Sequence, residues 1–197
     1  MPEEALIENC SPVLAGLKTA NLFSICCTDR EAVRRDLREM NAIFVRKGLR
    51  AIPLGQTGTH TLIYIYRPNR LQEDLRDERA REILKERGYH PEDAGSCVIR
   101  MIRKLREAPG EFPHEIGLFL GYPAEDVEGY IRDRGKHPKL SGFWQVYGDP
   151  QYAQCTFSRY RRCMSCYDKA YECGFSIDRL TVPAAGRKTK AGTFPSA

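Results

Sequence analysis

The sequence predicts a mixed α/β protein in which a small sheet containing a hairpin is covered by helices. Residues 60–66 (HTLIYIY) are rich in β-branched and aromatic side chains, as strands are, and a turn at 55–58 separates them from the apolar run 49–54. Most other segments repeat apolar residues every three or four positions, the period of an amphipathic helix. These segments dominate the C-terminal half, which is expected to be mainly helical. An α+β arrangement is the alternative.

Length and composition are those of one globular domain. The chain has 197 residues, of which 42% are hydrophobic and 29% are charged, as in ordinary folded proteins. We expect a single domain over residues 1–180, with the helical half at about 91–180. Residues 181–197 combine small, basic and helix-breaking residues without an apolar period, which predicts a disordered tail.

The charge balance argues against a nucleic-acid partner. The formal net charge is +5, but Arg187, Lys188 and Lys190 of the predicted tail contribute three of these charges. The remainder is only weakly basic, whereas nucleic-acid-binding domains carry a concentrated positive surface.

The N-terminal segment predicts a cytoplasmic protein. Glu3 and Glu4 stand where a signal peptide carries basic residues, and no run of about eighteen apolar residues follows that could cross a membrane. In that compartment the eight cysteines are expected to be reduced and to serve as free thiols, metal ligands or redox groups.

The first predicted elements are a short helix and a buried strand. Ser11 is a suitable N-cap and Pro12 a suitable first helical residue, so we expect a helix from Pro12 to about Thr19. The apolar run 21–27 follows as a strand.

The next helix has recognisable ends. Thr28 and Glu31 have the spacing of a capping box, and Gly48 is a typical C-terminal stop. Beyond it, the second strand of the hairpin carries apolar residues on both faces, Leu62 on one and Ile63 on the other. We therefore expect this strand to be central, with helices on both sides.

Helices account for most of the remaining chain. A short strand is expected around Trp144, which is predicted to anchor the core. The predicted helical segments are 69–88, 91–107, a helix-turn-helix-like hairpin at 113–134, and 149–173.

Cys10 is the first candidate for chemistry. Its position directly before the predicted helix start places the sulfur near the positive end of a helix dipole, which lowers the pKa of a thiol. Such a thiol is suited to be a nucleophile, a redox group or a soft-metal ligand, and Lys18 would favour its thiolate. The alternative interpretation is a small residue that packs at a helix entrance.

His114 and Glu115 are the second candidates. Histidine and glutamate together serve as a general base pair or as metal ligands. A cysteine and a distant histidine that meet in space are also the pattern of thiol hydrolases. The alternative is a pair of residues that interact with the N-terminus of a helix.

The last predicted helix carries the candidate metal ligands. Cys155 and Cys173 would lie about 27 Å apart along it, too far to share one ion. Cys163 and Cys166 are close enough to chelate together, but a closed site would need two further ligands, such as Cys10 or Cys26. Cysteines that pack against other helices are the alternative.

The segment 113–134 matches the apolar-glycine-apolar spacing of a helix-turn-helix unit. Its second helix would bring Glu125, Asp126 and Glu128 toward the phosphates of DNA, which repel them. We therefore favour a structural helix hairpin over a DNA reader.

Three motifs carry a resemblance to a known family. CSPVLAGLKTANLF at 10–23, FPHEIGLFLGYPAEDVEGYI at 112–131 and GFWQVYGD at 142–149 resemble a bacterial family of unknown function, DUF3793, over about residues 10–180. This family is typical of anaerobic bacteria and is sometimes found beside flavodoxin-like or iron-uptake proteins. The resemblance thus implies a cytoplasmic setting, redox or metal physiology, and a flavodoxin-like or metal-handling partner. The matching residues are Cys10, Pro12, Gly16, Lys18, Asn21, His114, Glu115, Gly117, Gly121, Pro123, Trp144 and Gly148.

The leading hypothesis from the sequence is a thiol-dependent accessory protein of redox or iron metabolism. Cys10 would be the reactive thiol or a ligand of iron, zinc or haem, with Lys18, His114 and Glu115 as partners. One alternative is a non-enzymatic module that docks a protein or nucleic acid through residues 159–162. The other is a cysteine hydrolase that uses Cys10 and His114. The sequence does not decide whether the protein is an enzyme.

Overall fold

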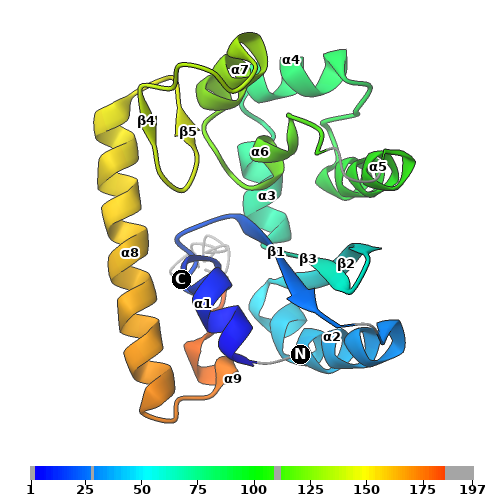
Figure 1. Ribbon diagram of the computed structural model, residues 1–197, viewed down its shortest axis with the longest axis vertical. Coiled ribbons are helices and arrows are strands. Elements are labelled where there is room, and N and C mark those ends of the chain that lie inside the picture. The colour runs from blue at the N-terminus through cyan, green and yellow to red at the C-terminus, as the bar shows by residue number, and fades with distance from the viewer. Residues whose placement is uncertain (1–2, 28, 109–111, 185–197) are drawn as a thin grey trace, which may run out of the picture.

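The core of the fold is an antiparallel sheet with the strand order β1-β3-β2 (Figure 1). The computed structural model describes residues 3–27, 29–108 and 112–184. The predicted hairpin is formed by β2 and β3, and β3 is the central strand. The strands are β1 (Ala20–Cys26), β2 (Arg50–Thr57) and β3 (His60–Tyr66).

Helices cover both faces of this sheet, which confirms the mixed α/β fold class (Figure 1). Ile63 and Ile65 point into a core shared with α1 (Glu3–Leu14) and α2 (Arg30–Phe44). Tyr64, on the opposite face, packs with the helices from α3 to α7, and its hydroxyl donates to the carbonyl of Phe119 at 2.6 Å. The alternation of side chains along β3 therefore supplies two cores from one strand.

The N-terminal helix differs from its prediction. It begins at Glu3, so Pro12 lies inside its last turn and not at its start. Ser11 does not cap a helix, because its hydroxyl donates to the carbonyl of Ile7 one turn earlier. An apolar stripe with helical spacing continues through the proline, and its burial outweighs the lost backbone hydrogen bond. The buried residues of this stripe are Leu6, Ile7, Cys10, Val13 and Leu14.

The ends of α2 are close to those predicted. Asp29 is its N-cap and accepts two backbone N–H groups, whereas Thr28 lies outside the described residues. A 3-10 turn, η1 (Val45–Lys47), extends the helix to Gly48, which has φ of 75° and ends it as predicted.

The middle of the chain contains α3 (Pro68–Asp74), α4 (Glu78–Glu86) and α5 (Ala94–Glu107). The single helix predicted for residues 69–88 is thus two helices. Asp77 causes the break, because its side chain accepts the N–H of Ala80 and begins α4.

The C-terminal half is mainly helical, as expected. Asp149 caps α8, and this long helix stands along one edge of the molecule against α1 (Figure 1). Among the described residues, no helix combines the length and apolar character needed to cross a membrane. The elements are α6 (Ile116–Phe119), α7 (Ala124–Asp133), β4 (Leu140–Ser141), β5 (Gln145–Val146), α8 (Pro150–Glu172) and α9 (Ile177–Leu180).

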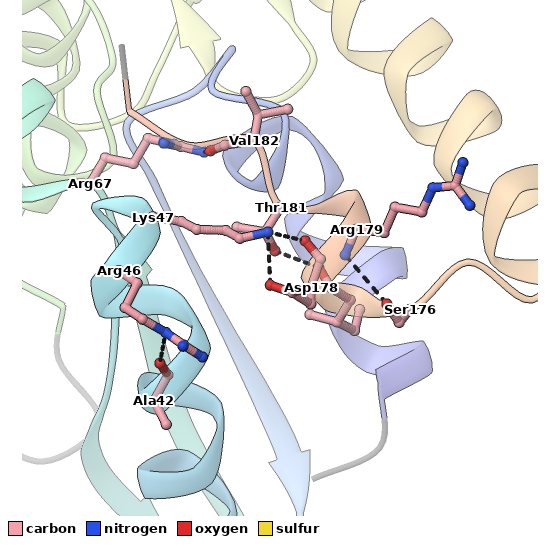
Figure 2. A network of polar contacts seen from close by, with 10 residues as sticks. Ala42, Arg46, Lys47, Arg67, Ser176, Asp178, Arg179, Thr181 and Val182 are labelled. Atoms are coloured by element: carbon pink, nitrogen blue, oxygen red, sulfur yellow. Dashed lines mark hydrogen bonds and ion pairs between the residues drawn. The ribbon is translucent and has the colours of Figure 1, made fainter. Parts of the chain in front are cut away.

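The chain after α9 is attached to the core, contrary to the expected start of a disordered tail at residue 181. The N–H of Val182 donates to the carbonyl of Leu14 at 2.9 Å, and that of Ala184 to Lys47 at 2.9 Å. Lys47 also forms an ion pair of 2.8 Å with Asp178 of α9 (Figure 2). Residues 185–197 lie outside the described part.

Arg67 is the centre of this attachment. Its side chain is buried and donates to three carbonyls, those of Val13 at 2.8 Å, Leu14 at 2.9 Å and Val182 at 2.8 Å. In Figure 2 it reaches from the end of β3 toward Val182. One guanidinium thus joins the end of α1, the sheet and the C-terminal segment.

Replacement of Arg67 by methionine is expected to lower the free energy of unfolding by about 3 kcal/mol, because buried carbonyls lose a charged donor. Urea unfolding would measure the change. Arg46→Met is the matched control, since Arg46 is exposed and donates to the carbonyl of Ala42 one turn earlier. Equal stability of the two variants would contradict this role of Arg67.

Candidate functional site

Cys10 lies in the interior of the fold. Its side chain is fully buried near the C-terminal end of α1, so the predicted position at a helix N-terminus is wrong. Burial raises its pKa to about 12, although the charge of Lys18 and a hydrogen bond with Asn21 act in the opposite direction. The thiol is therefore protonated at neutral pH and is a poor nucleophile.

Lys18, in contrast, is brought next to Cys10 as the sequence suggested. It is also buried, and its ammonium donates to Asn21 Oδ1 at 2.6 Å. Asn21 in turn donates to the carbonyl of Asn9 at 2.6 Å. Burial lowers the pKa of Lys18 to about 8, and Cys10 opposes this shift. The ammonium also lies 5.4 Å from the centre of the Tyr122 ring.

Glu115 belongs to a different, charged cluster. Its buried carboxylate accepts from the hydroxyl of Tyr89 at 3.0 Å and pairs with Lys104 at 2.7 Å and Arg87 at 3.7 Å. Burial is the largest single effect and raises the pKa of Glu115, but the hydrogen bonds it accepts and the charge of Lys104 together outweigh burial, so the pKa is lowered. Glu115 thus links α6 to α4 and α5.

His114 has other neighbours than Glu115 and Cys10. Its side chain is exposed and its ring meets the Tyr130 ring edge-on, with centroids 5.4 Å apart. The partners of Glu115 come from α4 and α5, and the electrostatic partners of Cys10 are Lys18 and Asn21. Of the four predicted site residues, the structure therefore brings together only Cys10 and Lys18.

The cysteines of α8 offer two neighbouring thiols and no complete metal site. All eight cysteines are free. Cys163 is buried, and its pKa is raised to about 11 by burial and by the neighbouring Cys166, which is exposed. In the part of the chain that the structure describes, no group of three or more histidine, cysteine or acidic side chains is placed to hold an ion. Metal binding by this pair stays a prediction.

An open pocket of about 450 Å³ lies between the α6–α7 hairpin and the β4–β5 hairpin. Rings surround it from both hairpins, and Asp126 and Gln145 supply polar atoms. Of these ring-bearing residues, only His114 and Trp144 are predicted from the sequence to have a role. The sequence did hold a signal for the pocket, because the motifs at 112–131 and 142–149, which line it, are both rich in aromatic residues. The ring-bearing residues are Phe112, His114, Tyr122, Tyr130, Phe143 and Trp144.

Asp126 holds the two hairpins together. Its Oδ1 accepts the backbone N–H groups of Tyr147 and Gly148, both at 2.7 Å, and its Oδ2 accepts the indole N–H of Trp144 at 2.7 Å. Asp126 is also buried, so its carboxylate does not face outward, where a DNA-binding helix-turn-helix would place it. Gly129 permits the close approach, because a Cβ there would lie 2.4 Å from Cβ of Tyr147.

Trp144 is fixed inside an aromatic cluster. Its ring stacks on Tyr122 with centroids 5.3 Å apart and an angle of 27°, and it meets Phe157 edge-on at 4.5 Å. Phe143 packs edge-on against Tyr160 of α8 at 5.2 Å. The expectation that Trp144 is a core anchor is consistent with these contacts, and the same residue also lines the pocket.

A comparison with protein-family models matched residues 6–181 to a family described as "Protein of unknown function (DUF3793)". The chain belongs to this family. Neither the curated proteins nor the solved structures contained a match.

In this DUF3793 chain the three motifs that carry the family resemblance meet at Tyr122. Lys18 of the first motif lies over the Tyr122 ring of the second, and Trp144 of the third stacks on it. The pocket is lined by the second and third motifs. Lys18, more than a hundred residues before Tyr122 in the sequence, thus contacts a residue of the pocket wall.

Proposed function

We propose that this protein binds a small ligand with a planar, unsaturated ring in the aromatic pocket. The observation that carries the proposal is that aromatic side chains line both sides of the pocket, which we call its two walls. Tyr130 and His114 come from the α6–α7 side, and Phe143 and Trp144 come from the β4–β5 hairpin. A volume of about 450 Å³ lies in the range of small-molecule sites.

Aromatic walls favour flat ligands for a physical reason. A planar ring that enters between them gains offset or edge-on contacts, and stacking of a base on an aromatic side chain contributes about 1–3 kcal/mol. Gln145 can orient such a ligand. Its Oε1 accepts from the Tyr147 hydroxyl at 3.1 Å, which leaves its NH₂ group to donate to the ligand. The pocket is therefore suited to a ring that carries hydrogen-bond acceptors.

The hypothesis of a thiol-dependent accessory protein with a flavodoxin-like or metal-handling partner stays a prediction. Its thiol step is disfavoured at Cys10, whose burial keeps the sulfur protonated. A cysteine hydrolase would need Cys10 and His114 within hydrogen-bond reach, and their neighbours belong to different parts of the fold. A binding protein, in contrast, needs none of these residues to be reactive.

The experiment uses the single tryptophan of the chain, Trp144, as a reporter inside the pocket. Indole-free ring compounds, namely quinoline, adenine and riboflavin, would be titrated while its fluorescence is followed. We expect saturable quenching by at least one probe, with an affinity about tenfold lower in Phe143→Leu and in His114→Ala, since each removes a ring from one wall.

Tyr152→Ala is the control, because Tyr152 is an exposed ring of α8 outside the pocket. It should leave the titration unchanged. Quenching that does not saturate, or that is equal in wild type and both wall variants, would refute ligand binding in this pocket.

A further inference from the structure

A second feature is the cluster of cations around Glu115. Arg100 and Lys104 are one turn apart on α5 and therefore lie on the same face of the helix. Lys104 and Arg87, the C-cap of α4, both pair with the Glu115 carboxylate. Arg100 lies within electrostatic reach of the Tyr89 hydroxyl, which donates to the same carboxylate. Two cations thus pair with Glu115, and a third lies near Tyr89, the hydroxyl donor of the same carboxylate.

The hydrogen bonding of this cluster is incomplete. The Nε atoms of Arg87 and Arg100 are buried without an acceptor, and buried donors of this kind are rare because each costs about 1–3 kcal/mol. Within the described residues Arg100, half-buried, forms neither an ion pair nor a hydrogen bond. Like charges at positions i and i+4 also repel each other.

We propose that Arg87, Arg100 and Lys104 form a binding site for a phosphate group, free or as a monoester. Three cations and one carboxylate leave a surplus of two positive charges, and a phosphate monoester carries about −1.5 to −2 at pH 7. Guanidinium groups match phosphate oxygens with paired N–H donors. The ligand would bind the guanidinium groups through their terminal NH₂ groups, because the Nε atoms are buried.

The site is distinct from the aromatic pocket. None of its three cations lines that pocket, and its anchor, Glu115, points to α4 and α5 through its partners. The adjacent residues His114 and Glu115 therefore serve two different sites, His114 the aromatic pocket and Glu115 the cationic cluster. The phosphate site can be tested, and can fail, without any consequence for the pocket.

Isothermal titration calorimetry with inorganic phosphate and with phenyl phosphate, at constant ionic strength in a chloride buffer, would test the site. We expect saturable binding of at least one of them to one site per chain. Arg100→Gln should weaken it about tenfold or more, which is a loss of about 1.4 kcal/mol. Arg103→Gln, an exposed position on the same helix, should bind as the wild type does. Tighter binding of phenyl phosphate would identify an ester as the ligand, and equal binding would identify the phosphate group alone.

Glu115→Gln should change the affinity for phosphate in the opposite direction. It removes the internal counter-charge, so phosphate should bind more tightly although the fold is less stable. Far-UV circular dichroism would verify that each variant is folded. No saturable heat from either phosphate, or equal affinity in wild type and Arg100→Gln, would overturn the proposal.

Discussion

Replacing Lys18 by methionine is expected to raise the free energy of unfolding by about 3 kcal/mol at pH 7. The side chain is 5% exposed, and its acceptor is the neutral amide oxygen of Asn21. Burial lowers its pKa from 10.5 to about 8. Each unit of this shift corresponds to about 1.4 kcal/mol by which folding disfavours the ammonium. Methionine has a similar length and carries no charge, so the penalty disappears.

The pH dependence of stability identifies the cause. Above pH 8 the folded protein loses the Lys18 proton while the unfolded chain keeps it, so Lys18 by itself makes stability rise with pH by up to about 1.4 kcal/mol per unit. The thiols of Cys10, Cys97 and Cys163 oppose this rise, because burial raises the pKa of each above 9.0 and the unfolded chain loses their protons first. The effect of Lys18 is therefore measured as the difference in stability between Lys18→Met and the wild type, which keeps the three thiols in common.

Urea unfolding at pH 7, 8, 8.5 and 9 would measure both effects. The gain in stability of Lys18→Met over the wild type should shrink by about 1 kcal/mol from pH 7 to 9, whereas Lys136→Met, at an exposed lysine, should stay within about 0.5 kcal/mol of the wild type at each pH. A Lys18→Met protein less stable than the wild type at pH 7 would show that the buried ammonium is held by a favourable interaction.

Much of the fold could be predicted because its determinants are local. Residues 60–66 carry apolar side chains on both faces, which predicted a central strand. Gly48 and Asp149 predicted helix ends correctly, because a helix end is determined by a few neighbouring residues. The predicted start of the N-terminal helix was wrong because it depended on packing beyond the immediate neighbours in sequence. Its proline obeyed a local rule, but burial of a stripe that runs through Pro12 was worth more than one backbone hydrogen bond.

The candidate site was less predictable because it depends on contacts between distant segments. The low thiol pKa expected at Cys10 required a helix that begins at Pro12. The helix begins at Glu3 instead, so Cys10 is far from the positive end of its dipole. His114 and Glu115 are adjacent in sequence, yet one lines the aromatic pocket and the other joins a cluster of cations. Residue types at a given spacing cannot reveal this, since it follows from which distant residues contact each of the two side chains.

Asp126→Ala is expected to lower the free energy of unfolding by about 4 kcal/mol, because two backbone N–H groups and the indole N–H lose their acceptor and each costs about 1–3 kcal/mol. Urea unfolding followed by far-UV circular dichroism would measure the loss. The emission of Trp144 should shift to longer wavelength as its ring becomes hydrated. Glu128→Ala, an exposed position on the same helix, should change stability by no more than about 0.5 kcal/mol.

A double-mutant cycle would separate the contact with Trp144 from the contacts with the backbone. In Asp126→Asn, Oδ1 can still accept from Tyr147 and Gly148, but the amide NH₂ would face the indole N–H, and two donors repel each other. Trp144→Phe removes that indole donor, so Asp126→Asn should be less damaging by about 1–2 kcal/mol in its presence. Additive losses would mean that Asp126 acts only through the backbone of the hairpin, and that the position of Trp144 in the pocket depends on ring packing alone.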